Sequence, residues 1–283
     1  MKTRRENTAN YSSVFLNGKT LRIPINKAKP ITELKYPEFY DVSLGNKCTT
    51  GKCPWCYASG SSKGKHYSNV AQKIHDYFGP MTENQRPYQI ALGGQQEPLE
   101  HPEIKAVLQT FVKLGIVPNL TTNGVLFGED AAKLVKKYCG GIAITMHPHL
   151  EKYWRKAIEV SLQNKIKTNV HYVVSGTQSI EKLQVLYNEY SDRVEYFVLL
   201  PYMNVGRATA CPKIIDYVSL EKWLDQVHSM GKIAFGANFY KFLAPLKKWD
   251  VSLYPPEIFS KYLVCDKMTL YNNSFVSLLK LVN

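Results

Sequence analysis

Three cysteines, Cys48, Cys53 and Cys56, fall within nine residues of one another. Thiolates are soft ligands, and so tight a group is typical of a zinc ion or an iron–sulfur cluster. A closed structural zinc site has four protein ligands, whereas three cysteines leave one coordination position open. His66, which follows Cys56 by ten residues, is the candidate fourth ligand for zinc. The cysteines alone therefore leave both kinds of metal centre open.

The chain has the composition of a globular protein, with 283 residues of which 45% are hydrophobic and 21% are charged. That length fits one large domain or two small ones. No apolar run approaches the roughly 20 residues that cross a bilayer. The charged residues 1–7 are not followed by the apolar segment of a signal peptide. We therefore expect a cytoplasmic protein without a membrane partner, in which grouped cysteines bind metal rather than form disulfides.

The chain is strongly basic, with a net charge of +13 and a pI of about 9.3. Such a charge favours anionic partners such as nucleic acid, nucleotides or anionic peptides. The lysines are spread along the sequence, however, and no RNA- or DNA-binding motif accompanies them. A solvated basic surface is the simpler explanation of the charge, and an anionic substrate is compatible with it.

From residue 40 onward, short apolar runs alternate with amphipathic stretches every 25–30 residues or so, which is the pattern of βα units. Strands are expected at residues 40–44, 88–92, 117–121, 142–146, 169–174, 194–200 and 233–236. Helices are expected at residues 68–78, 102–114, 129–138, 150–162, 180–190 and 219–230. Right-handed βα units in succession build a curved parallel sheet wrapped by helices. We therefore predict an α/β fold, a partial (β/α)6 TIM-like barrel.

The competing architecture is a doubly wound open sheet, which typically has a glycine-rich phosphate loop after its first strand. Here that loop holds the cysteines, so the barrel is favoured. Residues 37–238 form the predicted barrel. Residues 1–36 are polar and are expected to be an irregular N-terminal extension with one edge strand at residues 21–25. Residues 239–283 lose the βα rhythm and are expected to form a C-terminal cap segment on the barrel.

In a parallel barrel the functional site forms at the C-terminal ends of the strands. The second strand leads into residues 93–98, Gly-Gly-Gln-Gln-Glu-Pro, and the third into residues 121–124, Thr-Thr-Asn-Gly. With the cysteine loop after the first strand, this combination resembles the radical S-adenosylmethionine (radical SAM) enzyme superfamily over roughly residues 40–210. The cysteine gaps here are four and two residues (CX4CX2C), whereas most members have three and two.

The resemblance implies that Cys48, Cys53 and Cys56 hold a [4Fe–4S] cluster and that S-adenosylmethionine binds at its open iron. An electron donor such as flavodoxin or ferredoxin would reduce the cluster. Reductive cleavage of S-adenosylmethionine would then give a 5′-deoxyadenosyl radical that abstracts hydrogen from an unidentified substrate, a nucleotide, nucleic acid or peptide. The alternative function is a zinc-stabilised, basic nucleic-acid-binding protein without catalysis.

The resemblance also implies a set of cofactor-binding residues, although it singles out no catalytic side chain. The backbones of Gly93 and Gly94 would approach the methionine amino group closely, with Gln95 or Glu97 as the side-chain partner. Trp55 or Tyr57 would lie near the adenine. The residues expected at the barrel mouth, near the ribose or carboxylate, are Thr122, Asn123 and Thr145.

The remaining cysteines and two loop histidines are not expected to bind a metal or to take part in catalysis. Cys139, Cys211 and Cys265 lack the spacing of a second cluster, so buried small apolar side chains are the better interpretation. His147 and His149 follow the fourth strand without an obvious partner, and a lone loop histidine is usually incidental.

Overall fold

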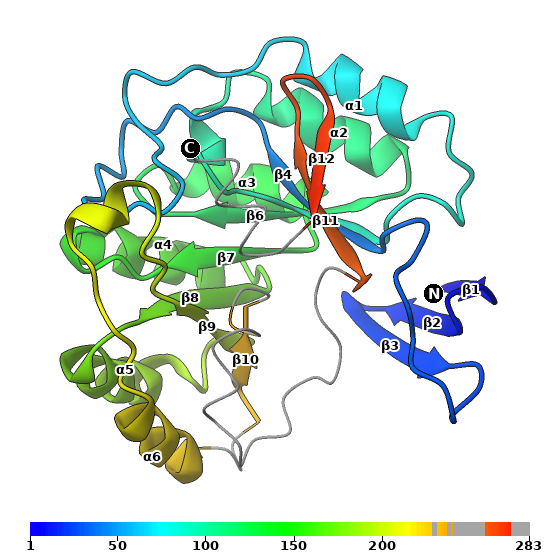
Figure 1. The fold of residues 1–283 in the computed structure, drawn as a ribbon. Helices are drawn as coiled ribbons and strands as arrows, with labels where there is room; N and C mark the ends of the chain where they lie inside the picture. The colour runs from blue at the N-terminus through cyan, green and yellow to red at the C-terminus, as the bar shows by residue number, and fades with distance from the viewer. Residues whose placement is uncertain (228–230, 237–238, 240–257, 273–283) are drawn as a thin grey trace.

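A nine-stranded sheet forms the centre of the computed structural model, which describes residues 1–227, 231–236, 239 and 258–272 (Figure 1). The order of the strands is β10-β9-β8-β7-β6-β5-β4-β11-β12, and all neighbours are parallel except the antiparallel pair β11 and β12. The strands are β4 (Phe39–Ser43), β5 (Gln89–Leu92), β6 (Val117–Thr122), β7 (Gly141–Thr145), β8 (Thr168–Val174), β9 (Tyr196–Pro201), β10 (Ile233–Phe235), β11 (Ser260–Val264) and β12 (Thr269–Asn272).

Each strand from β4 to β9 is followed by a helix that packs around the outside of the curved sheet (Figure 1). The helices are α1 (Val70–Phe78), α2 (Ile104–Lys113), α3 (Glu129–Tyr138), α4 (Glu151–Gln163), α5 (Thr177–Tyr190) and α6 (Tyr217–Val227). Short 3-10 turns precede or follow them: η1 (Pro98–Glu100), η2 (Pro148–Leu150) and η3 (Gly206–Ala210). The structure thus confirms the predicted partial (β/α) barrel.

Alternation along the strands divides apolar from polar side chains. In β8, Val170, Tyr172 and Val174 are buried against the helices, in one cluster with Trp154 and Tyr187. The intervening residues face the inside of the barrel and are more accessible. Because a strand's side chains alternate between its two faces, the apolar outer face is covered by helices and a more polar face lines the interior.

The N-terminal residues form a separate antiparallel sheet of β1 (Lys2–Glu6), β2 (Tyr11–Leu16) and β3 (Lys19–Pro24). The expectation of an irregular segment was therefore wrong here. Asn17 and Gly18 join β2 to β3 with φ values of 52° and 82°, the left-handed conformations that an Asn-Gly hairpin turn adopts. That dipeptide was the overlooked signal. The ring of Phe15 stacks on Tyr88, with centroids 5.1 Å apart, which fixes this sheet against the barrel.

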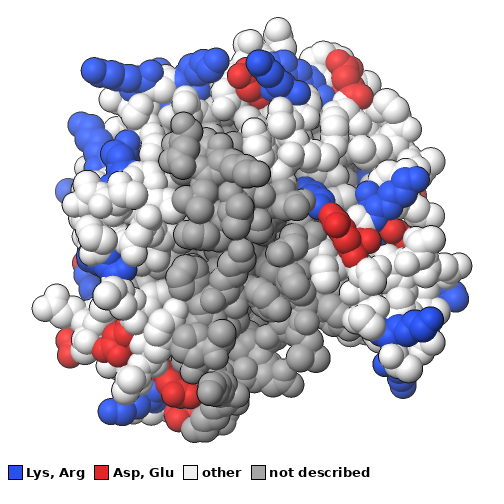
Figure 2. All heavy atoms as spheres, in the orientation of Figure 1, with Lys and Arg blue, Asp and Glu red and all other residues white. Residues whose placement is uncertain are grey.

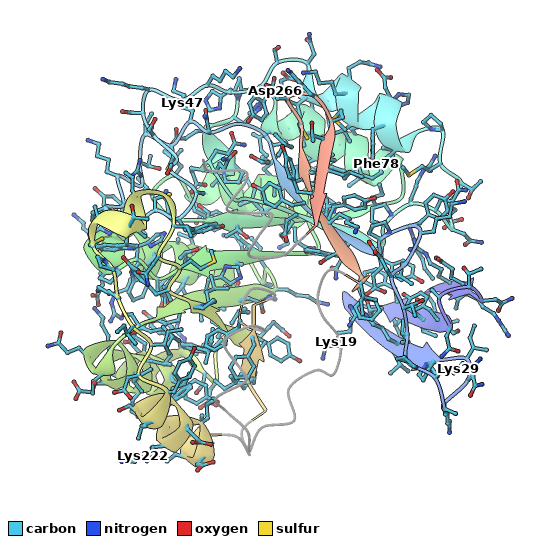
Figure 3. The ribbon with its side chains drawn as sticks, viewed as in Figure 1. Lys19, Lys29, Lys47, Phe78, Lys222 and Asp266 are labelled. Carbon is cyan, nitrogen blue, oxygen red and sulfur yellow. The ribbon has the colours of Figure 1, made fainter. Side chains whose placement is uncertain are left out.

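The C-terminal segment contributes β11, which pairs with β4 and so extends the main sheet. The rest of the predicted cap, residues 240–257 and 273–283, lies outside the described residues. No helix within the described part of the chain is long and apolar enough to span a membrane. On the face shown in Figure 2, Lys and Arg side chains lie mainly around the periphery, with Asp and Glu among them. Figure 3 places Lys47 at the end of the molecule to which β6 and β7 point, and Lys29 far from it.

Candidate functional site

The three cysteines lie in the long loop between β4 and α1, at the C-terminal end of the sheet. The loop folds back on itself, because the N–H of Cys48 donates to the carbonyl of Ser61 at 2.9 Å. Gly51 sits between the thiols: a Cβ there would come within 2.9 Å of Cys48 Sγ and 3.5 Å of Cys53 Sγ. A side chain at position 51 would therefore occupy the space that the thiols face.

The loop after β5 holds the first half of the cysteine loop. The Glu100 carboxylate accepts hydrogen bonds from the backbone N–H of Thr49, at 2.9 Å, and of Thr50, at 3.1 Å, and from the Thr50 hydroxyl at 2.9 Å. Asn123, after β6, donates from Nδ2 to Thr50 Oγ1 at 2.9 Å. His149, after β7, donates to the carbonyl of Gly51 at 2.6 Å. Three separate loops thus fix the four-residue gap between Cys48 and Cys53.

The loop after β9 holds the second half. The Arg207 backbone N–H donates to the carbonyl of Cys56 at 3.1 Å, and its side-chain Nε donates to the carbonyl of Cys53 at 3.2 Å. Gly206 has a φ of 58°, and a Cβ there would clash with the carbonyl of Tyr57. The Cys53–Cys56 turn is therefore clamped by a segment about 150 residues away in sequence.

Burial controls the protonation of the thiols in the metal-free chain. Burial, together with the neighbouring Cys56 and Cys48, raises the pKa of Cys53 to about 12, although Arg207 opposes the shift. Burial also raises the pKa of Cys48. These thiols are consequently protonated near neutral pH, and a bound metal must displace their protons.

The Gly93–Pro98 loop brings a buried carboxylate to the end of β6. Glu97 Oε1 accepts from the Thr122 hydroxyl at 2.8 Å, and Oε2 accepts from the Asn123 backbone N–H at 2.8 Å. Gly94 has a φ of 86°, and a Cβ there would clash with the hydroxyl of Tyr262 on β11. Both amide atoms of Gln96 are buried and have no hydrogen-bond partner among the described residues. Glu97 thus links two of the predicted loops.

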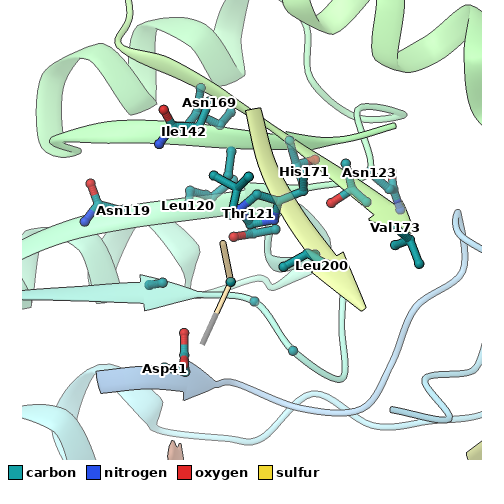
Figure 4. Close-up of a pocket in the computed structure, with 18 of the residues that line it drawn as sticks. Asp41, Asn119, Leu120, Thr121, Asn123, Ile142, Asn169, His171, Val173 and Leu200 are labelled. Atoms are coloured by element: carbon teal, nitrogen blue, oxygen red, sulfur yellow. The ribbon is translucent and has the colours of Figure 1, made fainter. Parts of the chain in front are cut away.

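A cavity of about 860 Å³ runs through the barrel from the cysteine loop to the turn between β2 and β3 (Figure 4). It also holds His147 and His171, whose pKa values burial lowers to about 4, so both imidazoles are neutral near pH 7. All the residues predicted for the site line it: Cys48, Cys53, Cys56, Trp55, Tyr57, Gly93, Gly94, Gln95, Glu97, Thr122, Asn123 and Thr145.

The structure does not gather His66 and the cysteines around one ion. No group of three or more His, Cys, Asp or Glu side chains in the described ranges is placed to hold a single metal ion. The ring of His66 instead packs edge-on against His101, with centroids 5.1 Å apart. Cys265 is buried in an apolar cluster that Cys139 packs against, and Cys211 lies 3.3 Å from the hydroxyl of Tyr202.

Sequence reasoning missed the residues that hold the cysteine loop in place: Glu100, Arg207 and His149. Each acts through the backbone of a loop distant in sequence, and none belongs to a recognisable motif. The position of Glu100 just after Glu97 was the only local hint. His149 was taken as incidental, and its hydrogen bond to Gly51 shows that this interpretation was wrong.

No known family model matches the chain, and no curated protein matches it in sequence. In three dimensions it is similar to SuiB of Streptococcus suis bound to S-adenosylmethionine, with 16% identity, 82% of this chain and 59% of SuiB covered, and a TM-score of 0.66. SuiB bound to the precursor peptide SuiA gives 15% identity, 82% and 58% coverage, and the same TM-score of 0.66. The chain therefore spans less than three fifths of the length of SuiB.

It is also similar to anSMEcpe with bound AdoMet (S-adenosylmethionine), with 14% identity, 83% of this chain and 74% of anSMEcpe covered, and a TM-score of 0.59. Identities this low show a shared fold. The class that fold and site define here is thus a partial (β/α) barrel with a three-cysteine loop at the C-terminal end of its sheet, built like proteins solved with S-adenosylmethionine bound.

Proposed function

We propose that this chain is a radical SAM enzyme of the CX4CX2C type, with Cys48, Cys53 and Cys56 as the ligands of a [4Fe–4S] cluster. The observation that carries the proposal is the arrangement of the cysteine loop. Hydrogen bonds from the loops after β5, β6, β7 and β9 fix it beside a large cavity. The donor set fits the cluster, because the loop offers three thiols and His66, the candidate fourth ligand, packs against His101 instead.

Other residues of the site would hold S-adenosylmethionine. The backbones of Gly93 and Gly94 are candidates for the methionine end, with Gln95 beside them. Glu97 is already bonded to Thr122 and Asn123, so its role is to position the β6 loop. Trp55 or Tyr57 would contact the adenine, and Thr145 would line the ribose side. When bound, the cluster and S-adenosylmethionine would supply one-electron cleavage of S-adenosylmethionine and hydrogen-atom abstraction from a substrate.

The barrel's own contribution is positioning. The cavity is lined by strands of the barrel and by residues of the cysteine loop, so a substrate bound in it would lie beside the cysteines. An acidic electron-transfer protein would supply the electron, and the basic surface of the chain suits such a partner.

Anaerobic reconstitution with iron and sulfide tests the function. We expect a coloured protein with about four irons per chain, as a [4Fe–4S] cluster requires, and dithionite-dependent formation of 5′-deoxyadenosine. A triple change of Cys48, Cys53 and Cys56 to Ala should abolish both colour and cleavage. Colourless protein with stoichiometric zinc after anaerobic purification would instead favour the zinc-stabilised nucleic-acid-binding protein, and turnover by the triple variant would contradict the ligand assignment.

A further inference from the structure

Two lysines line the far end of the cavity, which is the end beside the turn between β2 and β3. Lys19 is the first residue of β3, at the end of the N-terminal sheet that faces the barrel (Figure 3). Lys167 directly precedes β8. Asn169 comes two residues later on the same side of that strand and also lines the cavity (Figure 4).

Uncharged partners hold both ammonium groups in place. Lys167 Nζ donates to the carbonyl of Asn17 at 3.3 Å. Lys19 Nζ lies 5.7 Å from the centroid of the Tyr196 ring, and Tyr196 is paired with Asn169 in the register of β8 and β9. The two lysines therefore lie at one corner of the cavity, close to Asn169.

This corner has an excess of positive charge. Neither lysine forms an ion pair with another described residue. Glu195 also lines the far end of the cavity, but one carboxylate does not balance two ammonium groups. Like charges that share a site repel each other, and an anion bound between them removes that repulsion. The corner is therefore suited to an anionic group.

Asn169 adds a hydrogen-bond acceptor to this corner. Its Oδ1 is buried and has no partner among the described residues, and buried polar groups are nearly always paired. An amide oxygen pairs with a donor such as a hydroxyl and not with an ionised oxygen. Because Asn169 lies about 6.6 Å farther along the strand than Lys167, one ligand can reach both if it carries an anionic group and a hydroxyl at about that separation.

A sugar phosphate carries these two groups. A phosphate monoester has a charge of about −1.5 to −2 near neutral pH, which two ammonium groups neutralise, and the ring hydroxyls of a pentose 5-phosphate lie one sugar length away. We propose that Lys19 and Lys167 bind the phosphate of a sugar phosphate, either free or within a nucleotide, and that Asn169 accepts a hydrogen bond from one of its hydroxyls. This inference rests on the proposed function of the same cavity, and it favours a nucleotide among the substrate classes compatible with the sequence.

Titration calorimetry with ribose 5-phosphate and uridine 5′-monophosphate tests the inference. The full chain is purified anaerobically, reconstituted with iron and sulfide, and supplied with S-adenosylmethionine so that the probes do not enter its site. We expect saturable binding of at least one phosphate, with ribose and uridine at least about tenfold weaker, because they lack the charged group. Tighter binding of uridine 5′-monophosphate would identify a nucleotide, and equal binding of the two a free sugar phosphate.

Substitutions at the corner separate these contacts from general charge. Lys19→Met and Lys167→Met should each weaken phosphate binding by about tenfold, whereas Lys167→Arg keeps the charge and should retain most of it. Lys165→Met makes the same charge change at an exposed residue outside the cavity lining, and this matched control should leave binding unchanged. Glu195→Gln should tighten binding roughly twofold, because it removes a negative charge beside the anion.

Asn169→Ala tests the hydroxyl contact. It should weaken the binding of the sugar phosphate but leave the binding of inorganic phosphate unchanged. Equal weakening of both ligands would overturn the assignment of a sugar phosphate. The inference would also fail if neither phosphate bound, if both methionine variants bound normally, or if Lys165→Met weakened binding as much as they do. Formation of 5′-deoxyadenosine is measured separately, so loss of the phosphate site and failure of the proposed enzyme give different results.

Discussion

The carboxylate of Glu97 is buried where the loops after β5 and β6 meet. Burial is the main cause that raises its pKa to about 7, although hydrogen bonds from Asn123, Thr122 and Leu99 favour the ionised form. Near neutral pH the group is therefore close to half protonated in the folded chain. In the unfolded chain the same side chain ionises at an ordinary pKa near 4.3.

This difference predicts a pH-dependent stability at one residue. Between about pH 4.5 and 7 the folded state holds a proton that the unfolded state has lost, so the contribution of Glu97 to stability falls as pH rises. Glu97→Gln cannot titrate. The variant should gain stability relative to the wild type from pH 5 to pH 8, by an amount on the order of 3 kcal/mol.

Urea unfolding of both metal-free proteins at pH 5 and pH 8 measures this difference. At pH 5 we expect Glu97→Gln to be the less stable protein, because its amide N–H₂ meets the Asn123 N–H and cannot accept its hydrogen bond. A stability difference that stays constant across this pH range would contradict a raised pKa for Glu97.

At the scale of elements, the cysteine loop gains order from its neighbours. The longer first gap between the cysteines needs anchoring because a flexible loop would spread its thiols. The Glu100 carboxylate gives that anchoring through the backbones of Thr49 and Thr50. A carboxylate that accepts several backbone hydrogen bonds makes stronger interactions than a neutral acceptor.

Glu100→Ala should therefore weaken retention of the metal centre without unfolding the barrel. We expect the reconstituted variant to lose iron to a chelator about tenfold faster, which corresponds to about 1.4 kcal/mol of lost loop stabilisation. Far-UV circular dichroism should not change. Glu103→Ala is the matched control, since Glu103 also accepts from a backbone N–H, that of Ala71 in α1, but does not touch the cysteine loop. Equal iron loss from both variants would contradict a role for Glu100 in fixing the cysteine loop.

Some helices and strands could be predicted from the sequence, and others could not. Strands such as β8 are continuous runs with strong β propensity bounded by turn residues, so their existence and order were predictable from the sequence. The N-terminal sheet was missed because its strands are polar on one face, although Asn17-Gly18 marks its hairpin. The pairing of β11 with β4 joins segments more than 200 residues apart, and no local pattern encodes such a contact.

The residues of the candidate site also divide into those that the sequence predicts and those that depend on the fold. Cys48, Cys53 and Cys56 were identifiable because their spacing is local, and the register of the loops that follow β5 and β6 was visible in the sequence. Arg207 could not be assigned, because its role depends on two hydrogen bonds to carbonyls of a turn that precedes it by some 150 residues. That Asn169 Oδ1 is buried without a partner among the described residues likewise depends on the fold and not on local sequence.

At the scale of the whole molecule, charge is distributed unevenly around the cysteine loop. Between Asp41 and Asp76 the sequence has no acidic residue and five lysines, at positions 47, 52, 63, 65 and 73. Among the described residues, acidic side chains from elsewhere that approach this segment include Glu100 at the backbone of Thr49, Glu103 at the backbone of Ala71 and Asp266 at 3.7 Å from Lys65. Lys52 and Lys63 are exposed. The surface beside the proposed cluster is therefore basic, which favours the approach of an acidic electron donor.

Reversal of charge at Lys52 and Lys63 tests this use of the surface. The double change to Glu should slow reduction by flavodoxin by about tenfold at low salt, because steering by charge acts mainly on association. Added salt should shrink the difference as screening increases. Reduction by dithionite, a small molecule, should be unaffected, which separates docking from damage to the cluster. Lys27→Glu with Lys29→Glu, both exposed beyond β3, is the charge-matched control. Lys29 lies far from Lys47, which is next to Cys48 in the sequence (Figure 3). If the control pair slowed reduction by flavodoxin equally, net charge rather than this surface would govern the encounter.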